Sequence, residues 1–171
     1  INHKTADVAV RERFSLTKTQ TKESLAELKR SGVLGAVILS TCNRTEIYVE
    51  SLRNEAGLGI IKTFIVKRFG IPEKDLAAYF YISEDREAIR HIARVSSGLD
   101  SQVLGETQVL GQVRDALSFA RQMLASSGLV ERIFEKAIEI GGLVRLRTNI
   151  SYGNVSIGSV AISMLEDRFG G

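Results

Sequence analysis

The sequence has few of the residues that constrain a chain covalently or stiffen its loops. Its 171 residues include one cysteine, one proline and no tryptophan. A single cysteine excludes an internal disulfide, which fits a reducing compartment. One cysteine and two histidines are too few for a Cys/His zinc site, so we expect no metal.

Long apolar runs are also missing. No segment approaches the roughly 20 apolar residues of a transmembrane helix, and the first residues, INHKTADVAV, lack the basic-then-apolar order of a secretory signal. The net charge of +3 is small, so charge alone predicts no nucleic-acid partner. With 44% hydrophobic and 25% charged residues, we expect a soluble globular protein. Because the chain opens on Ile1 rather than methionine, we expect an upstream piece to be missing.

Hydrophobic periodicity in the first half alternates between the helix and strand periods. Leu25 and Leu28 share one face of a helix over residues 21–30, and apolar three- and four-residue spacing predicts a second helix over 58–69. Strands are predicted for GAVILS (35–40), TEIYVE (45–50) and AYFYI (78–82). With one more strand at the N-terminus, the order is β-α-β-β-α-β, a ferredoxin-like arrangement.

After Ile82 the strand pattern stops and the helical pattern takes over. Ser83 is an expected N-cap, and helices are predicted over 84–97, 109–124, 130–144 and 155–169. We therefore expect an α+β fold, in which a ferredoxin-like βαββαβ subdomain is followed by an all-helical subdomain. The expected parts are residues 1–82, which carry the cysteine, 83–147, which are helical, and 148–171, a linker and helix.

The only thiol lies between two predicted strands, in LSTCNRTEIYVE (39–50). Arg44 follows Cys42 closely, and a cation beside an accessible thiol favours the thiolate. Free cysteines are more often buried as small apolar groups, but the polar neighbours of Cys42 argue against an apolar pocket. The residues alone therefore support a reactive and a structural thiol about equally.

A second polar motif, SGLDSQVLGETQVLGQV (97–113), precedes a predicted helix. Polar side chains and backbone N–H groups at a helix N-terminus can hold a carboxylate or polarise a carbonyl. The alternative is a loop capped for folding reasons, and His91, near a helix face, is by itself better explained as a surface histidine. No G-x-G-x-x-G follows a strand and no P-loop is present, so we expect no dinucleotide site in this chain.

Together, STCNRTEIY and SGLDSQVLGETQVLGQV, with NHKTA, VRERF and VRLRTN, resemble the glutamyl-tRNA reductase family over nearly the whole chain. In that family the motif cysteine attacks the ester that links glutamate to its tRNA and forms a thioester. NADPH then reduces the thioester to glutamate-1-semialdehyde, at the start of tetrapyrrole (5-aminolevulinate, porphyrin and haem) synthesis. The resemblance implies an oxidoreductase with Cys42 as nucleophile.

The resemblance also implies how the substrate is held. The planar fork of Arg44 can pair bidentately with the γ-carboxylate of the glutamyl group. The other implied site residues are Thr41, Ser101 and Gln108 at glutamyl contacts, His91 as a catalytic residue, Gly98 close to the site, and Glu106 with no assigned role. Asp7 and Thr107 stand where the family usually has proline, which bears on loop stiffness.

The family continues with a Rossmann domain for NADPH and a helical dimerisation domain. We expect NADPH to be bound by a domain absent from this chain, which alone would only form or hydrolyse the thioester. The implied partners are glutamyl-tRNA, a second copy in a full-length homodimer and glutamate-1-semialdehyde aminomutase, with no membrane. The implied location is the cytoplasm, or the plastid stroma in a plant.

Two other hypotheses stay open at this point. The first is a non-catalytic ferredoxin-like module that binds RNA or a ligand, although Tyr48, Tyr79, Phe80 and Tyr81 fit the pattern of an RNA-binding sheet poorly. The second is a cysteine hydrolase with His91 as base, for which no orienting Asn or Asp is evident.

Overall fold

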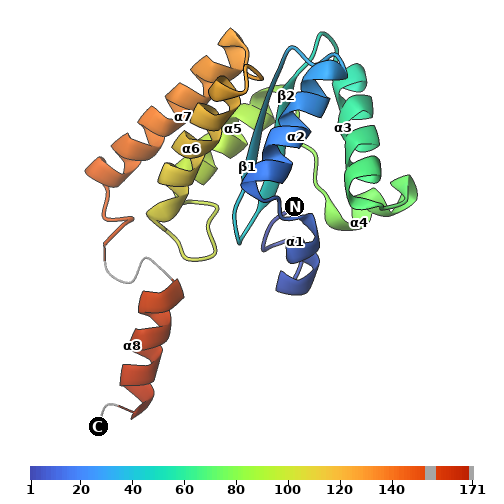
Figure 1. Cartoon of the computed structure of the whole chain (residues 1–171). Coiled ribbons are helices and arrows are strands. Elements are labelled where there is room, and N and C mark those ends of the chain that lie inside the picture. Colours follow the sequence, from blue (N-terminus) through green and yellow to red (C-terminus); the bar gives the residue numbers. More distant parts are fainter. Residues whose placement is uncertain (153–156, 170–171) are drawn as a thin grey trace.

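The structure is a computed structural model that describes residues 1–152 and 157–169. Figure 1 shows a short hairpin surrounded by helices. In chain order the elements are α1 (Val8–Phe14), α2 (Lys18–Arg30), β1 (Gly35–Ser40), β2 (Thr45–Glu50), α3 (Asn54–Phe69), the 3₁₀ turn η1 (Glu73–Asp75), α4 (Leu76–Tyr79), α5 (Asp85–Ser96), α6 (Gln108–Gln122), α7 (Gly128–Arg147) and α8 (Ile157–Phe169).

Both central strands and the long helices are confirmed. Local chemistry explains their ends: Thr17 and Gln20 form a capping box at the start of α2, and Gly70 ends α3 in the left-handed conformation. The expected N-cap at Ser83 is wrong by one residue, because Glu84 holds that position and α5 begins at Asp85. The first two residues of the predicted helix 155–169 lie outside the described residues.

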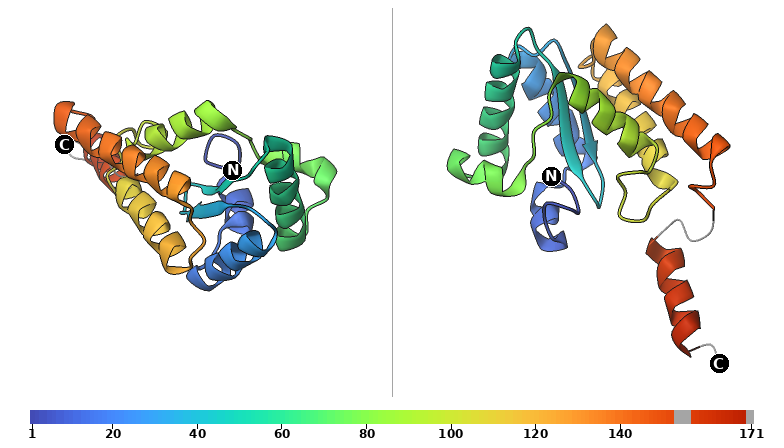
Figure 2. Two further views of the ribbon diagram at one scale, coloured as in Figure 1. Left: turned by 90° about the horizontal axis from the view of Figure 1, so that it is seen from above. Right: turned by 180° about the vertical axis from the view of Figure 1, so that it is seen from behind.

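The hairpin is antiparallel, with its register running from Gly35 opposite Glu50 to Ser40 opposite Thr45. Helices α2 and α3 lie on one side of it, and α5, α6 and α7 lie on the other (Figures 1 and 2). Burial from both sides explains why β1 reads as a continuous apolar run. The N-terminal segment joins this layer through a single antiparallel bridge between Asn2 and Arg44.

The predicted strand over residues 78–82 is wrong. Tyr79 ends α4, and the chain then runs to α5 without pairing to either strand. Tyr79 and Phe80 instead pack around Phe14, with ring centroids 5.7 and 5.0 Å from its ring. Aromatic residues favour strands mainly because they pack well on half-buried surfaces, and this aromatic cluster supplies such a surface without a sheet.

The α+β class is therefore confirmed, but the four-stranded ferredoxin-like sheet is not. Among the described residues the sheet has two strands, with α2 before them and α3 after them. The apolar core is one cluster with members on both sides of Ile82, such as Leu28, Val37, Ile92 and Phe134. The α+β and helical parts thus pack against each other.

The loop that precedes α6 is fixed by two glycines and one arginine. Gly98 and Gly105 both have positive φ, and the Gly105 amide donates to the Gly98 carbonyl at 3.0 Å. Arg145 of α7 donates to the carbonyls of Ser96 (2.5 Å) and Glu106 (2.8 Å). This loop lies at the same end of the hairpin as the β1–β2 turn and α1 (Figures 1 and 2).

Helix α8 stands apart from the other helices in Figure 1 and in the right-hand view of Figure 2. Across the described ranges, no helix has the length and apolar character needed to cross a bilayer.

Candidate active site at the Cys42 turn

Cys42 lies in the turn that joins the two strands, and it is exposed. The Thr41 amide donates to the Arg44 carbonyl at 2.8 Å, which closes the turn. The Thr41 hydroxyl accepts from the amides of Asn43 and Arg44, both at 3.2 Å. These bonds hold the backbone around the thiol, while the thiol itself faces solvent. The structure therefore favours the reactive interpretation of Cys42 over the structural one.

Arg44 points away from solvent into a set of acceptors, and only 2% of it is exposed. Its Nη1 donates to Glu46 Oε1 at 2.8 Å and to Asp100 Oδ2 at 3.2 Å, and its Nη2 donates to the Asp100 carbonyl at 2.5 Å. Lys4 pairs with the other carboxylate oxygen of Asp100 from the solvent side. Arg44 thus ties the cysteine turn to the loop that carries Ser101.

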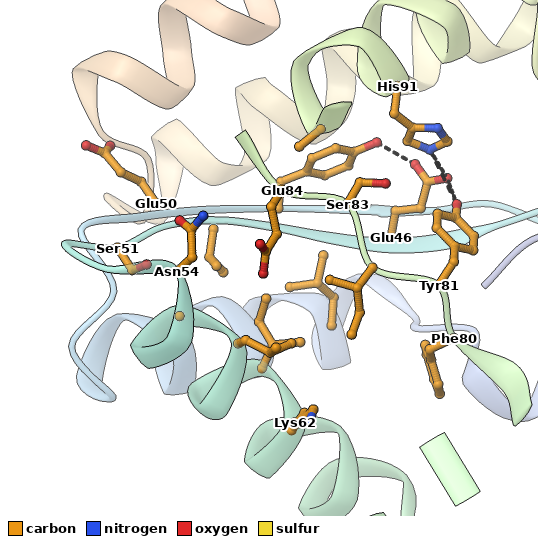
Figure 3. Close-up of a pocket in the computed structure, with 18 of the residues that line it drawn as sticks. Glu46, Glu50, Ser51, Asn54, Lys62, Phe80, Tyr81, Ser83, Glu84 and His91 are labelled. Atoms are coloured by element: carbon orange, nitrogen blue, oxygen red, sulfur yellow. Dashed lines mark hydrogen bonds and ion pairs between the residues drawn. The ribbon is translucent and has the colours of Figure 1, made fainter. Parts of the chain in front are cut away.

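Glu46 is the centre of a second group of contacts (Figure 3). His91 of α5 donates from Nε2 to Glu46 Oε1 at 2.9 Å, and the hydroxyls of Tyr81 and Tyr48 donate to the same carboxylate. The Tyr81 hydroxyl also lies 3.3 Å from His91 Nε2. His91 is therefore joined to Arg44 through one shared carboxylate.

These contacts decide the charge of the buried groups. Burial alone would raise the pKa of Glu46, but the His91 hydrogen bond and the Arg44 charge outweigh it and hold that pKa well below its usual range. Burial likewise opposes ionisation of Asp100, while Lys4 and Arg44 keep its pKa lowered. Burial and the Glu46 charge raise the pKa of Tyr81. The carboxylates of Glu46 and Asp100 therefore stay ionised. They remain paired with Arg44 and, for Asp100, with Lys4.

A cavity of about 550 Å³ begins beside this cluster and runs along β2. Figure 3 shows Glu46, Tyr81 and His91 at one end of it and Glu50, Ser51 and Asn54 at the other. Aliphatic side chains of α3, α5 and α7 form most of its walls, and Cys42 is not among its lining residues. The exposed thiol therefore lies at the turn, outside the lining of this cavity.

The N-terminal loop and α1 cover the other flank of the turn. The His3 amide donates to the Asn43 carbonyl at 3.1 Å. Arg11, which is largely buried, donates from Nε to the Cys42 carbonyl at 3.4 Å and from Nη1 to the Ala6 carbonyl at 2.7 Å. Asp7 caps α1 by accepting from the Val10 amide at 2.9 Å, so this residue fixes the loop by a hydrogen bond where the family usually has proline.

The structure gathers some of the predicted site residues and not others. Thr41, Cys42 and Arg44 share one turn, Ser101 is adjacent to the Arg44 partner Asp100, and His91 reaches Arg44 through Glu46. The Ser101 hydroxyl is buried without a hydrogen-bond partner.

The remaining predicted residues lie around the loop before α6. Gly98 shapes that loop through its positive φ. Glu106 is held through its backbone carbonyl, and Gln108 is exposed at the start of α6.

Sequence reasoning missed Glu46, Tyr81 and Lys4, and gave Asp100 no role. A signal was available for Glu46, because residues two apart on a strand lie on the same face and Glu46 is two residues after Arg44. Lys4 and Asp100 are 96 residues apart, and no local pattern links them.

The described residues do not fit a dinucleotide. The sheet is antiparallel, and the turn between its strands, Thr41 to Arg44, contains no glycine, whereas nucleotide cradles use a glycine-rich turn from strand to helix. In the described ranges, no three His, Cys, Asp or Glu residues are grouped as metal ligands.

Comparison with known proteins gives one consistent family. The family described as "Glutamyl-tRNAGlu reductase, N-terminal domain" matches residues 1–148. The chain is 45% identical to "Glutamyl-tRNA reductase" of Heliobacterium mobile, covering 100% of this chain and 39% of that protein. It is 43% identical to the protein of the same name from Carboxydothermus hydrogenoformans, covering 99% of this chain and 38% of that one.

The fold agrees with a solved structure, "Glutamyl-tRNA Reductase from Methanopyrus kandleri". The TM-score is 0.73 at 30% identity, over 99% of this chain and 39% of that chain. The chain thus spans well under half of the length of these relatives. The family match and the shared fold lead to the same conclusion, that this chain belongs to the glutamyl-tRNA reductase N-terminal domain family.

Proposed function

We propose that this chain carries the acyl-transfer site of a glutamyl-tRNA reductase and that Cys42 accepts the glutamyl group. The observation that carries the proposal is an exposed thiol on a turn fixed by hydrogen bonds, in a chain of this family. The complete enzyme would be an NADPH-dependent oxidoreductase that starts tetrapyrrole synthesis.

The proposed chemistry divides a difficult reduction into two steps. The Cys42 thiolate attacks the ester carbonyl of glutamyl-tRNA, the bond to the ribose oxygen breaks, and the glutamyl group stays on the protein as a thioester. A thioester accepts hydride far more readily than a carboxylate, which is the advantage of a covalent intermediate. NADPH supplies that hydride in the complete reaction and would be bound outside the described residues.

We propose substrate-holding roles for two side chains, Arg44 and Ser101. We propose Arg44 as the partner of the γ-carboxylate of the glutamyl group. The hydrogen bonds that Arg44 already makes set one condition for this pairing. Its terminal nitrogens already donate to Glu46 and Asp100, so an incoming carboxylate must share or replace one of these acceptors. The buried, unpartnered Ser101 hydroxyl has a hydrogen bond available for the glutamyl group.

The roles of the other predicted residues follow from their places. Thr41 holds the turn backbone through its side chain, and His91 is oriented by Glu46. Gly98 and Glu106 act through the shape of the loop, and Gln108 is exposed beside it.

Other expectations, from the sequence pattern and from the family resemblance, stay proposals. They are the partition into residues 1–82, 83–147 and 148–171, a ferredoxin-like relationship of the first part, the homodimer, the aminomutase partner and the cytoplasmic location. The non-catalytic RNA-binding alternative is not favoured, because Tyr79 and Phe80 pack against Phe14 rather than on a sheet face where bases would stack.

The test is transfer of label from glutamyl-tRNA to this chain. We expect radiolabelled glutamate to become attached through a bond that hydroxylamine cleaves, and Cys42→Ser to abolish the attachment. Glutaminyl-tRNA is the matched substrate control, and it should label the chain at least about tenfold more slowly, because it lacks the charge that Arg44 would pair with.

Two results would contradict the proposal. One is the absence of covalent label at every pH tried, and the other is equal labelling of the Cys42→Ser variant. If the chain alone converted glutamyl-tRNA into the semialdehyde when NADPH is added, that result would instead contradict the placement of NADPH outside the described residues.

A further inference from the structure

We propose that His3 is the general base and acid for acyl transfer at Cys42. This inference rests on the proposed function, and it assigns a residue that the sequence motifs left without a role. The cavity does not supply a base, because Cys42 does not line it. The groups around Arg44 (Glu46, Asp100, Lys4 and His91) do not supply one either, because they are already paired with one another or with Arg44.

Two backbone contacts bring His3 beside the turn that carries the thiol. Asn2 bridges Arg44, and the His3 amide donates to the carbonyl of Asn43, the residue next to Cys42. Arg11 holds the Cys42 carbonyl from α1. The N-terminal loop, α1 and the cysteine turn therefore form one hydrogen-bonded unit, with His3 on the segment that faces the turn.

The imidazole of His3 is the unusual feature of this unit. It is half-buried, its Nδ1 is buried without a partner, and neither ring nitrogen makes a hydrogen bond within residues 1–152 or 157–169. A buried polar atom normally has a partner, so an orphan at a site points to a group that arrives with the ligand. With its proton on the other ring nitrogen, Nδ1 offers a free lone pair.

The charges around His3 keep that lone pair available at neutral pH. Burial and the Arg44 charge lower the pKa of His3, and Lys4 and Arg11 act in the same direction. Asp100 acts in the opposite direction but is outweighed. The ring is therefore neutral near pH 7, which is the form that accepts a proton.

The other candidate bases are committed elsewhere. His91 donates to Glu46, Lys4 is paired with Asp100, and Asp7 caps α1. Glu46 and Asp100 are weak bases, because their pKa values are lowered. Catalytic hydrogen bonds are often long in ligand-free structures and tighten in the complex, so we expect the bond between His3 and the thiol to form only when the substrate is bound.

The proton balance is complete without any further reactant. The Cys42 S–H proton passes to His3, and the thiolate sulfur that this leaves bonds to the ester carbonyl carbon. The carbon–oxygen bond to the ribose then breaks, and the imidazolium returns the proton to the leaving ribose oxygen. The products are a thioester on Cys42 and a tRNA with a free terminal hydroxyl.

The test compares wild type with His3→Gln in single-turnover acylation between about pH 5 and pH 9. The wild-type rate should rise with pH through a pKa lower than that of an ordinary histidine, because the neutral ring is the active form. His3→Gln should lose this rise and react about 10²-fold more slowly near pH 7. Identical rates and pH profiles for both proteins would overturn the inference.

Two acyl donors make it possible to test the role of His3 separately from the proposed function. Acylation by glutamyl-tRNA depends on both, whereas acylation by p-nitrophenyl acetate needs only a thiol and a base. If the wild type reacts with the small ester but not with glutamyl-tRNA, the proposed function fails, and the effect of His3→Gln on ester acylation still decides the role of His3.

Rescue distinguishes chemistry from structure. Added imidazole should restore acylation of His3→Ala by at least tenfold, as a free base can replace a missing one but cannot rebuild a fold. His91→Gln serves as the comparison variant and should keep the rise with pH at the His3 pKa. Loss of that rise in His91→Gln, or no imidazole rescue of His3→Ala, would assign the proton transfer elsewhere.

Discussion

Arg44 donates from its two terminal nitrogens to both the side-chain carboxylate and the backbone carbonyl of Asp100, which lies 56 residues further along the chain. This pair joins the cysteine turn to the loop before α6, the two segments that carry the long sequence motifs. A planar guanidinium makes such two-pronged contacts, whereas a lysine ammonium acts as a point charge.

Replacing Arg44 by lysine should therefore cost more than conservation of charge suggests. We expect Arg44→Lys to slow thioester formation by about 10- to 100-fold, since it loses at least one charge-assisted hydrogen bond. Single-turnover labelling measures the rate, and the exposed Arg147→Lys is the matched control. Equal labelling rates for Arg44→Lys and wild type would exclude recognition of the γ-carboxylate by both terminal nitrogens of the guanidinium.

Removing the charge of Asp100 tests how far this connection stabilises the site. Asp100→Asn keeps the shape of the side chain but leaves Lys4 without its partner and Arg44 with one charged acceptor fewer. We expect a loss of about 1–3 kcal/mol in the free energy of unfolding, measured by urea denaturation. The exposed Asp115→Asn should change it by less than about 0.5 kcal/mol, and equal effects of the two variants would mean that the connection is energetically unimportant.

Glu46 should make stability depend on pH in the acid range. Its pKa is lowered in the folded state, so the unfolded state binds more protons as pH falls and the stabilisation is lost below about pH 5. Glu46→Gln should cost about 3 kcal/mol at pH 7, and this difference from wild type should shrink as the pH is lowered. Urea unfolding across pH measures both, with the exposed Glu12→Gln as control. A difference that is independent of pH would contradict a charged Glu46.

Gly105 should tolerate no side chain. Its φ is +80°, and a Cβ there would lie 1.7 Å from the Ile150 carbonyl oxygen. We expect Gly105→Ala to lower the free energy of unfolding by more than about 2 kcal/mol, because backbone strain adds to the displacement of residue 150.

A matched variant is available in α6. Nothing lies within 4 Å of a Cβ built on Gly111, and that residue is inside the helix. Gly111→Ala should be neutral or stabilising by up to about 1 kcal/mol. Thermal unfolding compares the two variants, and similar melting temperatures would mean that the loop accommodates the methyl group.

The sequence was most informative where structure is local. The hairpin and the long helices follow from apolar spacing and from end signals such as the Thr17 cap and Gly70, because these effects act within a few residues. The position of Cys42 in a turn followed from the strands on either side. The motif resemblance added the family, which the matching domain and the shared fold confirm.

Prediction failed where one segment had several possible partners. AYFYI has strand-forming residues, but Tyr79 and Phe80 pack around Phe14 and Tyr81 turns its hydroxyl to Glu46. A run of aromatic residues predicts that the rings will be buried, but it does not predict which residues they will pack against.

By itself the sequence determined the order of the central strands and long helices, the position of the thiol in a turn and the family. Only the tertiary structure decided what surrounds that thiol: Arg44 paired with Asp100, His91 bound to Glu46, and His3 placed beside the turn with no partner for its Nδ1. The physical reason is distance along the chain, since hydrogen bonds between residues 40 to 100 positions apart leave no periodic trace in the sequence and form only when the core brings their elements together.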